Sequence, residues 1–161
     1  MSVADLRSAL LGAFASVPAP DDDALVVGDP RYDPELRDVV HAFAGQDWRK
    51  LSPRFVYAHR DELPLLTFAA FRFFLPAYLL ACLEDESELD TAPLSVIASL
   101  TPPTDAAAAR VFVERTSLFT PDQAHAVHAA LVQVGTRDAA PPHSLAQAVA
   151  FWRLRALGVG C

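Results

Sequence analysis

Three side chains near position 125 are of the types that bind divalent metals. Asp122, His125 and His128 follow one another at steps of three residues. On a helix, residues three apart lie on adjacent turns, so a carboxylate and two imidazoles could form part of a metal site. Steps of three also rotate around the helix, which turns Asp122 away from His128. Such a site would need further ligands, and the candidates are Asp21, Asp22, Asp23 and His143.

Two interpretations of these residues remain open. In the first, Asp122, His125 and His128 belong to a small metal-dependent hydrolase. In the second, which we favour, they are solvated side chains on the polar face of a helix. Apolar residues at helical spacing mark the opposite face, namely Ala124, Val127, Leu131 and Val134. We therefore assign no metal and no other cofactor to the chain.

A single charge interrupts the most apolar stretch of the chain. Arg72 is the only charged residue between Leu63 and Leu83, and it lies among aromatic residues. A buried guanidinium must find a carboxylate, backbone carbonyls or an anionic ligand, because an unpaired buried charge is costly. We expect an internal ion pair with an acid such as Asp47 or Asp61, or a buried stem whose head reaches water. An anion-binding site is the alternative.

The last predicted helix carries residue types that are enriched at protein interfaces. Apolar residues cover more than one of its faces, which is typical of a helix in the centre of a core or in an interface. The candidate contact residues are Phe151, Trp152, Arg153 and Arg155, because tryptophan and arginine are common in interface hot spots. For Trp152 we favour packing in the core. The helix is therefore compatible with a protein partner or a homo-oligomer, and equally with a monomer in which it packs in the core.

Composition excludes several partners. The 161 residues include 13 Lys plus Arg against 20 Asp plus Glu, a formal net charge of -7 at pH 7. Binding to nucleic acid or to anionic lipid needs a basic face that displaces counterions, so we expect neither. The two cysteines, Cys82 and Cys161, lie far apart and do not suggest a disulfide framework, which favours a reducing cytoplasm.

The stretch from Leu63 to Leu83 is long enough to cross a bilayer. Near its centre, however, Arg72 would cost roughly 2.5 to 3.5 kcal/mol in lipid. Pro64 and Pro76 interrupt the helical pattern, and no basic cluster flanks either end. We therefore predict a kinked apolar helix at residues 68–84 that is buried in a protein core, and no membrane partner.

Capping residues divide the chain into helices joined by short turns that contain proline. The predicted caps are Ser2, Asp33, Ser52, Thr67, Thr104, Thr120 and Ser144. We expect glycine to end several helices, and Gly135 to end the one that Thr120 opens. Abundant alanine and leucine favour helix over sheet. The sequence thus predicts one all-α domain over residues 1–161, a bundle of about seven helices around the helix at 68–84.

Three segments resemble a family of small, uncharacterised bacterial proteins. The segments are Asp47-Trp48-Arg49, Phe71-Arg72-Phe73-Phe74-Leu75-Pro76-Ala77-Tyr78-Leu79 and Leu118-Phe119-Thr120-Pro121-Asp122-Gln123. The aromatic segment is the most specific of them, whereas the last is a general helix start. The family is classed as a domain of unknown function. The resemblance therefore implies a bacterial, helical, cytoplasmic protein and transfers no catalytic residue.

Sequence motifs of the common enzyme classes are missing. The chain contains no Gly-x-Ser-x-Gly elbow, no Walker loop and no dinucleotide-binding fingerprint. The sequence leaves open whether the protein is an enzyme and favours a noncatalytic binding or accessory protein that acts through protein contacts. The alternative is the small metal-dependent hydrolase that uses Asp122, His125 and His128. An acidic run at 84–90 is either a solvated loop or a docking surface for a basic partner.

Overall fold

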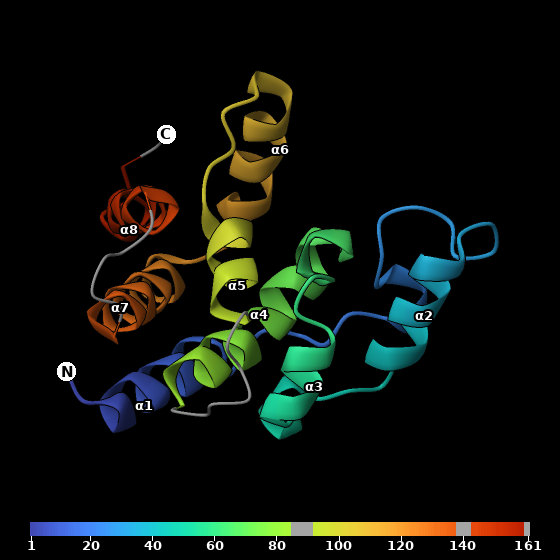
Figure 1. The fold of residues 1–161 in the computed structure, drawn as a ribbon, viewed down its shortest axis with the longest axis horizontal. Helices are drawn as coiled ribbons and strands as arrows, with labels where there is room; N and C mark the ends of the chain where they lie inside the picture. Colours follow the sequence, from blue (N-terminus) through green and yellow to red (C-terminus); the bar gives the residue numbers. More distant parts are fainter. Residues whose placement is uncertain (85–91, 138–142, 160–161) are drawn as a thin grey trace.

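The computed structural model describes residues 1–84, 92–137 and 143–159. Within these residues it contains eight α-helices and three short 3-10 turns, and the only β-type pairing is an isolated antiparallel bridge between Val26 and Leu66. The helices are α1 (Val3–Ala13), α2 (Pro34–Phe43), α3 (Pro53–Ala58), α4 (Phe68–Leu83), α5 (Ala92–Leu100), α6 (Ala106–Ser117), α7 (Pro121–Arg137) and α8 (His143–Ala156) (Figure 1). The 3-10 turns are η1 (Asp22–Ala24), η2 (Trp48–Lys50) and η3 (Leu63–Leu65). The predicted all-α bundle is confirmed.

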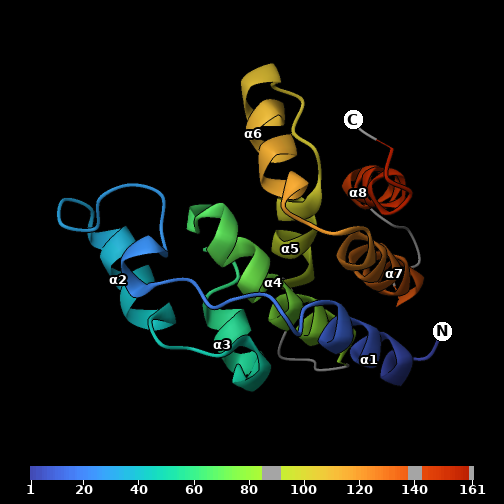
Figure 2. The same ribbon diagram turned by 180° about the vertical axis from the view of Figure 1, so that it is seen from behind.

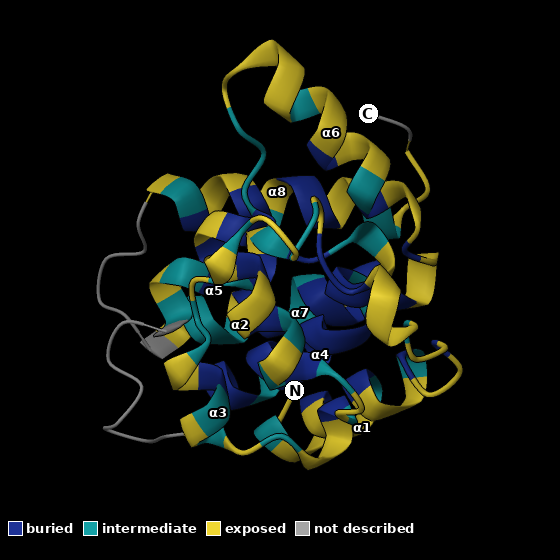
Figure 3. Ribbon diagram, turned by 90° about the vertical axis from the view of Figure 1, so that its right-hand side faces the viewer, coloured by how far each residue is buried: buried dark blue, intermediate teal, exposed yellow. Residues whose placement is uncertain are grey.

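The central helix is α4, which is apolar on all sides. Twelve of its 16 residues are buried, and Figure 3 shows it in dark blue in the middle of the molecule. Thr67 caps its first turn by accepting a hydrogen bond from the Ala70 N–H at 3.3 Å. Pro76 lies inside the helix and does not end it. Among the residues that the structure describes, no helix is both long and apolar enough to cross a bilayer.

The other helices surround α4 unevenly. The most extensive packing between described helices joins α7 to α8, and α1 packs on both α7 and α4. Helices α2 and α3 lie on the other side of α4 (Figure 1). Helix α6 extends away from the rest of the bundle in both Figure 1 and Figure 2. The molecule therefore has a densely packed centre and a margin at α6 that is much less covered.

Most helices begin at the predicted caps, with two exceptions. The side chains of Ser2, Asp33, Ser52, Thr67 and Thr120 each accept a hydrogen bond from a first-turn N–H. The Thr104 prediction is wrong, because the Asp105 carboxylate caps α6 by accepting from the Ala108 N–H at 2.8 Å. The Ser144 prediction is also wrong, because α8 already begins at His143. A carboxylate at the start of a helix also complements the helix dipole, which favours Asp105 over Thr104.

Gly135 does not end α7, contrary to the prediction. The helix continues to Arg137. A Cβ atom at Gly135 would lie only 3.0 Å from Cδ2 of Leu145 on α8, so glycine lets the Leu145 side chain pack closely against α7. Gly45 and Gly158, by contrast, have φ angles of +69° and +70° and follow the ends of α2 and α8.

Side chains from distant parts of the chain complete the ends of four helices. The last carbonyls of a helix have no donor within the helix, so they need partners from elsewhere. At the end of each of these four helices, at least one carbonyl accepts a hydrogen bond of 2.8 to 3.1 Å from a side chain at least 16 residues away. The donors are Gln123 for α1, Tyr78 for α3, Arg115 and Trp152 for α5, and Arg155 for α6. These bonds fix how the helix ends are placed against one another.

Candidate functional site

Arg72 is bound by an amide rather than by an acid. Its Nε donates a hydrogen bond to Oε1 of Gln123 at 2.9 Å. Neither Asp47 nor Asp61 reaches it, because Asp47 pairs with Arg49 and the ion-pair partner of Asp61 is the adjacent arginine. The predicted ion pair with one of these two acids is therefore wrong. Burial lowers the pKa of Arg72, although an arginine remains charged at neutral pH.

Gln123 joins three helices at the centre of the molecule. Its side chain is almost completely buried, with 1% exposed. Oε1 accepts from Nε of Arg72 on α4 and, at 3.2 Å, from the Thr120 N–H, while Nε2 donates to the carbonyl of Ala13 on α1 at 3.0 Å. We call these four residues the Gln123 joint. Because both the oxygen and the nitrogen of the Gln123 amide bond to other parts of the chain in it, the joint is a structural element.

The sequence showed only part of the Gln123 joint. Thr120 caps α7 as predicted, and Gln123 completes a capping box with it through hydrogen bonds of 3.2 Å in both directions. The link to α1 spans 110 residues and has no local pattern. One signal was available, because glutamine at this position of the box can donate as well as accept, whereas glutamate only accepts.

The proposed metal ligands do not come together. Asp122 and His125 are exposed on α7, and His128 is half-buried. Among the described residues, no three His, Cys, Asp or Glu side chains lie close enough to hold a metal ion, so Asp21, Asp22, Asp23 and His143 do not complete a site. Burial, and then the positive charges of His125 and Arg153, lower the pKa of His128. The positive charge of Arg153 is unfavourable for a cation bound nearby.

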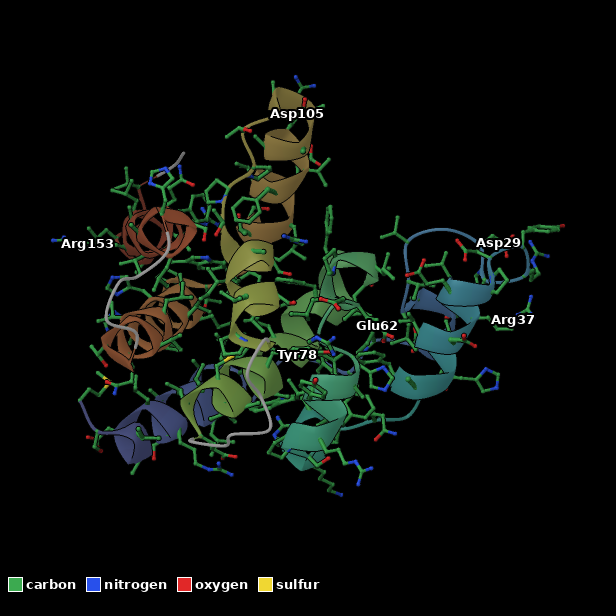
Figure 4. The ribbon with its side chains drawn as sticks, in the orientation of Figure 1. Asp29, Arg37, Glu62, Tyr78, Asp105 and Arg153 are labelled. Atoms are coloured by element: carbon green, nitrogen blue, oxygen red, sulfur yellow. The ribbon has the colours of Figure 1, made fainter. Side chains whose placement is uncertain are left out.

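The predicted interface residues of α8 are divided between core and surface. Trp152 is completely buried, and its Nε1 donates to the carbonyl of Leu100 at 3.0 Å. Phe151 is also buried, and Arg155 is half-buried with Nη2 bonded to a backbone carbonyl of α6. Only Arg153 is exposed, and Figure 4 shows it on the outer side of α8. A role of these four residues in an interface stays a prediction, with Arg153 as the accessible member.

The end of α8 presents an apolar surface. Leu154, Leu157 and Val159 are 45%, 68% and 49% exposed, and we call them the α8-end patch. The N–H of Val159 donates to the Leu154 carbonyl, and that of Gly158 to the Arg155 carbonyl, both at 3.1 Å. This pair of bonds is a Schellman motif, in which Leu154 and Val159 are brought next to each other. The patch is therefore fixed in shape as well as exposed.

Helix α6 borders an open hollow that is lined by residues of α5, α6 and the turns beside them. Only Phe112 and Thr116 of this helix are buried, and Val111 is 51% exposed. The hollow has a volume of about 430 Å³, and we call it the α5–α6 hollow. It is lined by Pro64, Ala98, Ser99, Thr101, Pro103, Ala108, Val111, Phe112 and Arg115. A smaller hollow of about 260 Å³ shares Pro64, Ala98 and Ser99 with it and reaches Asp61.

A third hollow, of about 380 Å³, lies between η1 and η2. Its floor is aromatic and its rim carries Asp22, Asp47 and Arg49. These charges are already engaged, because Asp22 accepts from the Gly45 N–H at 3.1 Å and Asp47 pairs with Arg49. The backbone N–H of Arg49 also lowers the pKa of Asp47. The charged groups at this rim already have partners within the protein, whereas Arg115 in the α5–α6 hollow has no acidic partner among the described residues.

The acidic run is described only at its first residue. Glu84 pairs with Arg7 of α1. Residues 85–90 lie outside the described residues, as does Cys161. Both interpretations of the run, a solvated loop and a docking surface for a basic partner, thus remain predictions.

The model of one protein family matches the chain. It is described as a Family of unknown function (DUF6714) and matches residues 28–156. The matched range holds α2 to α8, with both hollows beside α5, and leaves α1 outside. No curated protein and no solved structure matches the chain. The resemblance to a family of unknown function is confirmed.

Proposed function

The chain belongs to the DUF6714 family of unknown function, which brings no activity with it, and we propose that it is a noncatalytic binding protein that acts through protein contacts. The observation that supports this proposal most is the α8-end patch. Its three aliphatic side chains are exposed together at a helix end that the Schellman motif fixes. Exposed apolar groups held in one place are a feature of protein interaction surfaces.

The physical gain comes from covering the patch. Complete burial of one aliphatic side chain of this size is worth roughly 1.5 to 3 kcal/mol. Because the patch needs no rearrangement, little of this gain is lost to ordering it on binding. The α8-end patch can therefore form the apolar centre of an interface.

The charges near the patch indicate the chemistry of the partner. Arg153 is exposed one residue before Leu154, and it lies close enough to His128 to lower the pKa of that histidine. The partner that fits best therefore combines apolar side chains with acidic groups around them, because these would meet Arg153 at the rim of the interface. The metal-dependent hydrolase gains no comparable support, since Asp122, His125 and His128 stay apart from other ligands.

The test compares matched variants in a pulldown from native lysate. We expect the doubly substituted variant Leu154→Asp with Leu157→Asp to lose at least nine-tenths of the protein that the natural chain captures. Val27→Asp is the control, because Val27 is 60% exposed and lies in the segment before α2. Light scattering of each variant shows whether the partner is a second copy of the chain. Equal capture by the natural chain and the double variant would refute the proposal.

A further inference from the structure

Arg115 is a partly buried cation without a counter-charge. No ion pair involves it among residues 1–84, 92–137 and 143–159. Nη2 donates to the carbonyl of Ser99 at 2.9 Å, while Nε is buried and has no hydrogen-bond partner within that part of the chain. Burial lowers the pKa of Arg115, because the charged guanidinium is partly removed from water and no nearby acid compensates its charge. An anion that reached the guanidinium would supply the missing charge.

The guanidinium is also held in place. Its central carbon lies 4.2 Å from the centroid of the Phe71 ring and 5.4 Å from that of Phe112. These contacts are in the range of cation–π interactions, and with the bond to the Ser99 carbonyl they fix the side chain. A binding group that is ordered before the ligand arrives does not lose conformational entropy on binding.

The hollow beside Arg115 is mostly apolar. Its volume of about 430 Å³ lies within the range of roughly 300 to 1,000 Å³ that is usual for small-molecule sites. The two hydroxyl groups in its lining are engaged, because Ser99 Oγ donates to the Ser95 carbonyl and Thr101 Oγ1 to the Ile97 carbonyl. The remaining lining is alanine, valine, proline and phenylalanine. The site therefore offers one positive group at the edge of an apolar surface.

We infer that the α5–α6 hollow binds a small amphipathic carboxylate. The carboxylate group pairs with Arg115, and the hydrocarbon part lies against Ala108, Val111 and Phe112. The inference is independent of the proposed function, which uses the α8-end patch, so either can fail without the other.

The first experiment is a calorimetric titration of the full chain with decanoate. We expect Arg115→Met to weaken decanoate binding at least tenfold, because methionine keeps much of the apolar stem and removes the charge. Arg110→Met is the matched control, since Arg110 is an exposed arginine on the same helix outside the hollow, and its affinity should be unchanged. Decanol should bind the natural chain at least tenfold more weakly than decanoate. Equal affinities for decanoate and decanol, or no effect of Arg115→Met, would overturn the inference.

A second pair of variants tests the hollow without touching the charge. Ala108 and Ala107 are both exposed residues of α6, and only Ala108 lines the hollow. We expect Ala108→Phe to fill the hollow and abolish decanoate binding, and Ala107→Phe to leave it intact, with thermal unfolding of both variants near that of the natural chain. Equal decanoate binding by these two variants, or no detectable binding to the natural chain, would also overturn the inference.

Discussion

Arg72 on the central helix α4 and Arg115 on α6, at the margin of the molecule, are both partly buried and lack an acidic partner among the described residues. Arg72 donates a hydrogen bond from α4 to the side chain of Gln123 on α7. Arg115 lies on α6 beside an open hollow, and its Nε has no partner in the described part of the chain. Burial lowers the pKa of both. What differs is the neighbourhood, because the buried Gln123 side chain lies against Arg72 whereas an open hollow lies beside Arg115.

The two arginines show that a partly buried charge does not by itself indicate a binding site. An arginine in an apolar stretch signals that something must compensate it, but packing decides whether the compensation comes from the protein or from a ligand. At the centre the fold supplies the partner, so Arg72 serves the structure. At the margin the fold supplies no acid for Arg115, so we expect an anionic ligand to bind there.

The largest effect should come from the centre. We expect Trp152→Ala to lower the free energy of unfolding by about 4 kcal/mol, since it removes a completely buried ring and leaves the Leu100 carbonyl without its donor. Urea denaturation measures the change. At the margin, Val111→Ala on α6, at a residue that is 51% exposed, should change stability by less than about 0.5 kcal/mol. Similar losses from both variants would contradict the division into centre and margin.

A somewhat smaller effect is expected at the Gln123 joint. Gln123→Ala leaves Nε of Arg72 and the Ala13 carbonyl unpartnered, which should cost about 3 kcal/mol. Gln147→Ala is the control on exposed helix surface and should stay within about 0.5 kcal/mol. Gln123→Glu sharpens the test, because glutamate can pair with Arg72 but cannot donate to Ala13. If Gln123→Glu were as stable as the natural chain, the link to α1 would contribute nothing.

The direct comparison of the two arginines comes next. We expect Arg72→Met to lower the free energy of unfolding by about 2 kcal/mol and Arg115→Met by less than about 1 kcal/mol. The second loss is smaller because removing Arg115 also removes the buried, unpartnered Nε, which offsets its lost bond to the Ser99 carbonyl. Both changes are measured by urea denaturation at one pH. A larger loss from Arg115→Met would show that Arg115 is the more important of the two for the fold.

The smallest effect concerns pH. The pKa of His128 is lowered below its ordinary 6.5 by burial and by the charges of His125 and Arg153. The unfolded chain therefore binds more protons at this site than the folded chain, so the free energy of unfolding falls as the pH drops through about 6.5 and is regained above it. We expect His128→Asn to reduce the fall between about pH 7.5 and 5.5. An unaltered pH dependence in His128→Asn would contradict this assignment.

Local features of the fold were accessible from the sequence, because they depend on neighbouring residues. Asp33 followed by Pro34 predicts the start of α2, and Thr67 predicts the start of α4, since capping involves only the next few residues. The aromatic stretch around Arg72 predicts a buried central helix because no exposed face could be made from it.

Features that depend on distant contacts were not accessible. Gly135 has the pattern of a helix end, and only the position of Leu145 shows that it is a packing residue. Arg115 has the pattern of an ordinary surface residue on an alanine-rich helix, since nothing near it in sequence shows that Phe71 and Ser99 hold it. The α5–α6 hollow arises because α6 is incompletely covered, and no periodicity encodes that.

The most direct test of the account is a decanoate titration of the natural chain, Arg72→Met and Arg115→Met under conditions in which all three are folded. We predict that Arg72→Met binds decanoate with unchanged affinity and that Arg115→Met binds it at least tenfold more weakly. Loss of binding in Arg72→Met with full binding in Arg115→Met would contradict the claim that the centre serves the fold and the margin serves binding.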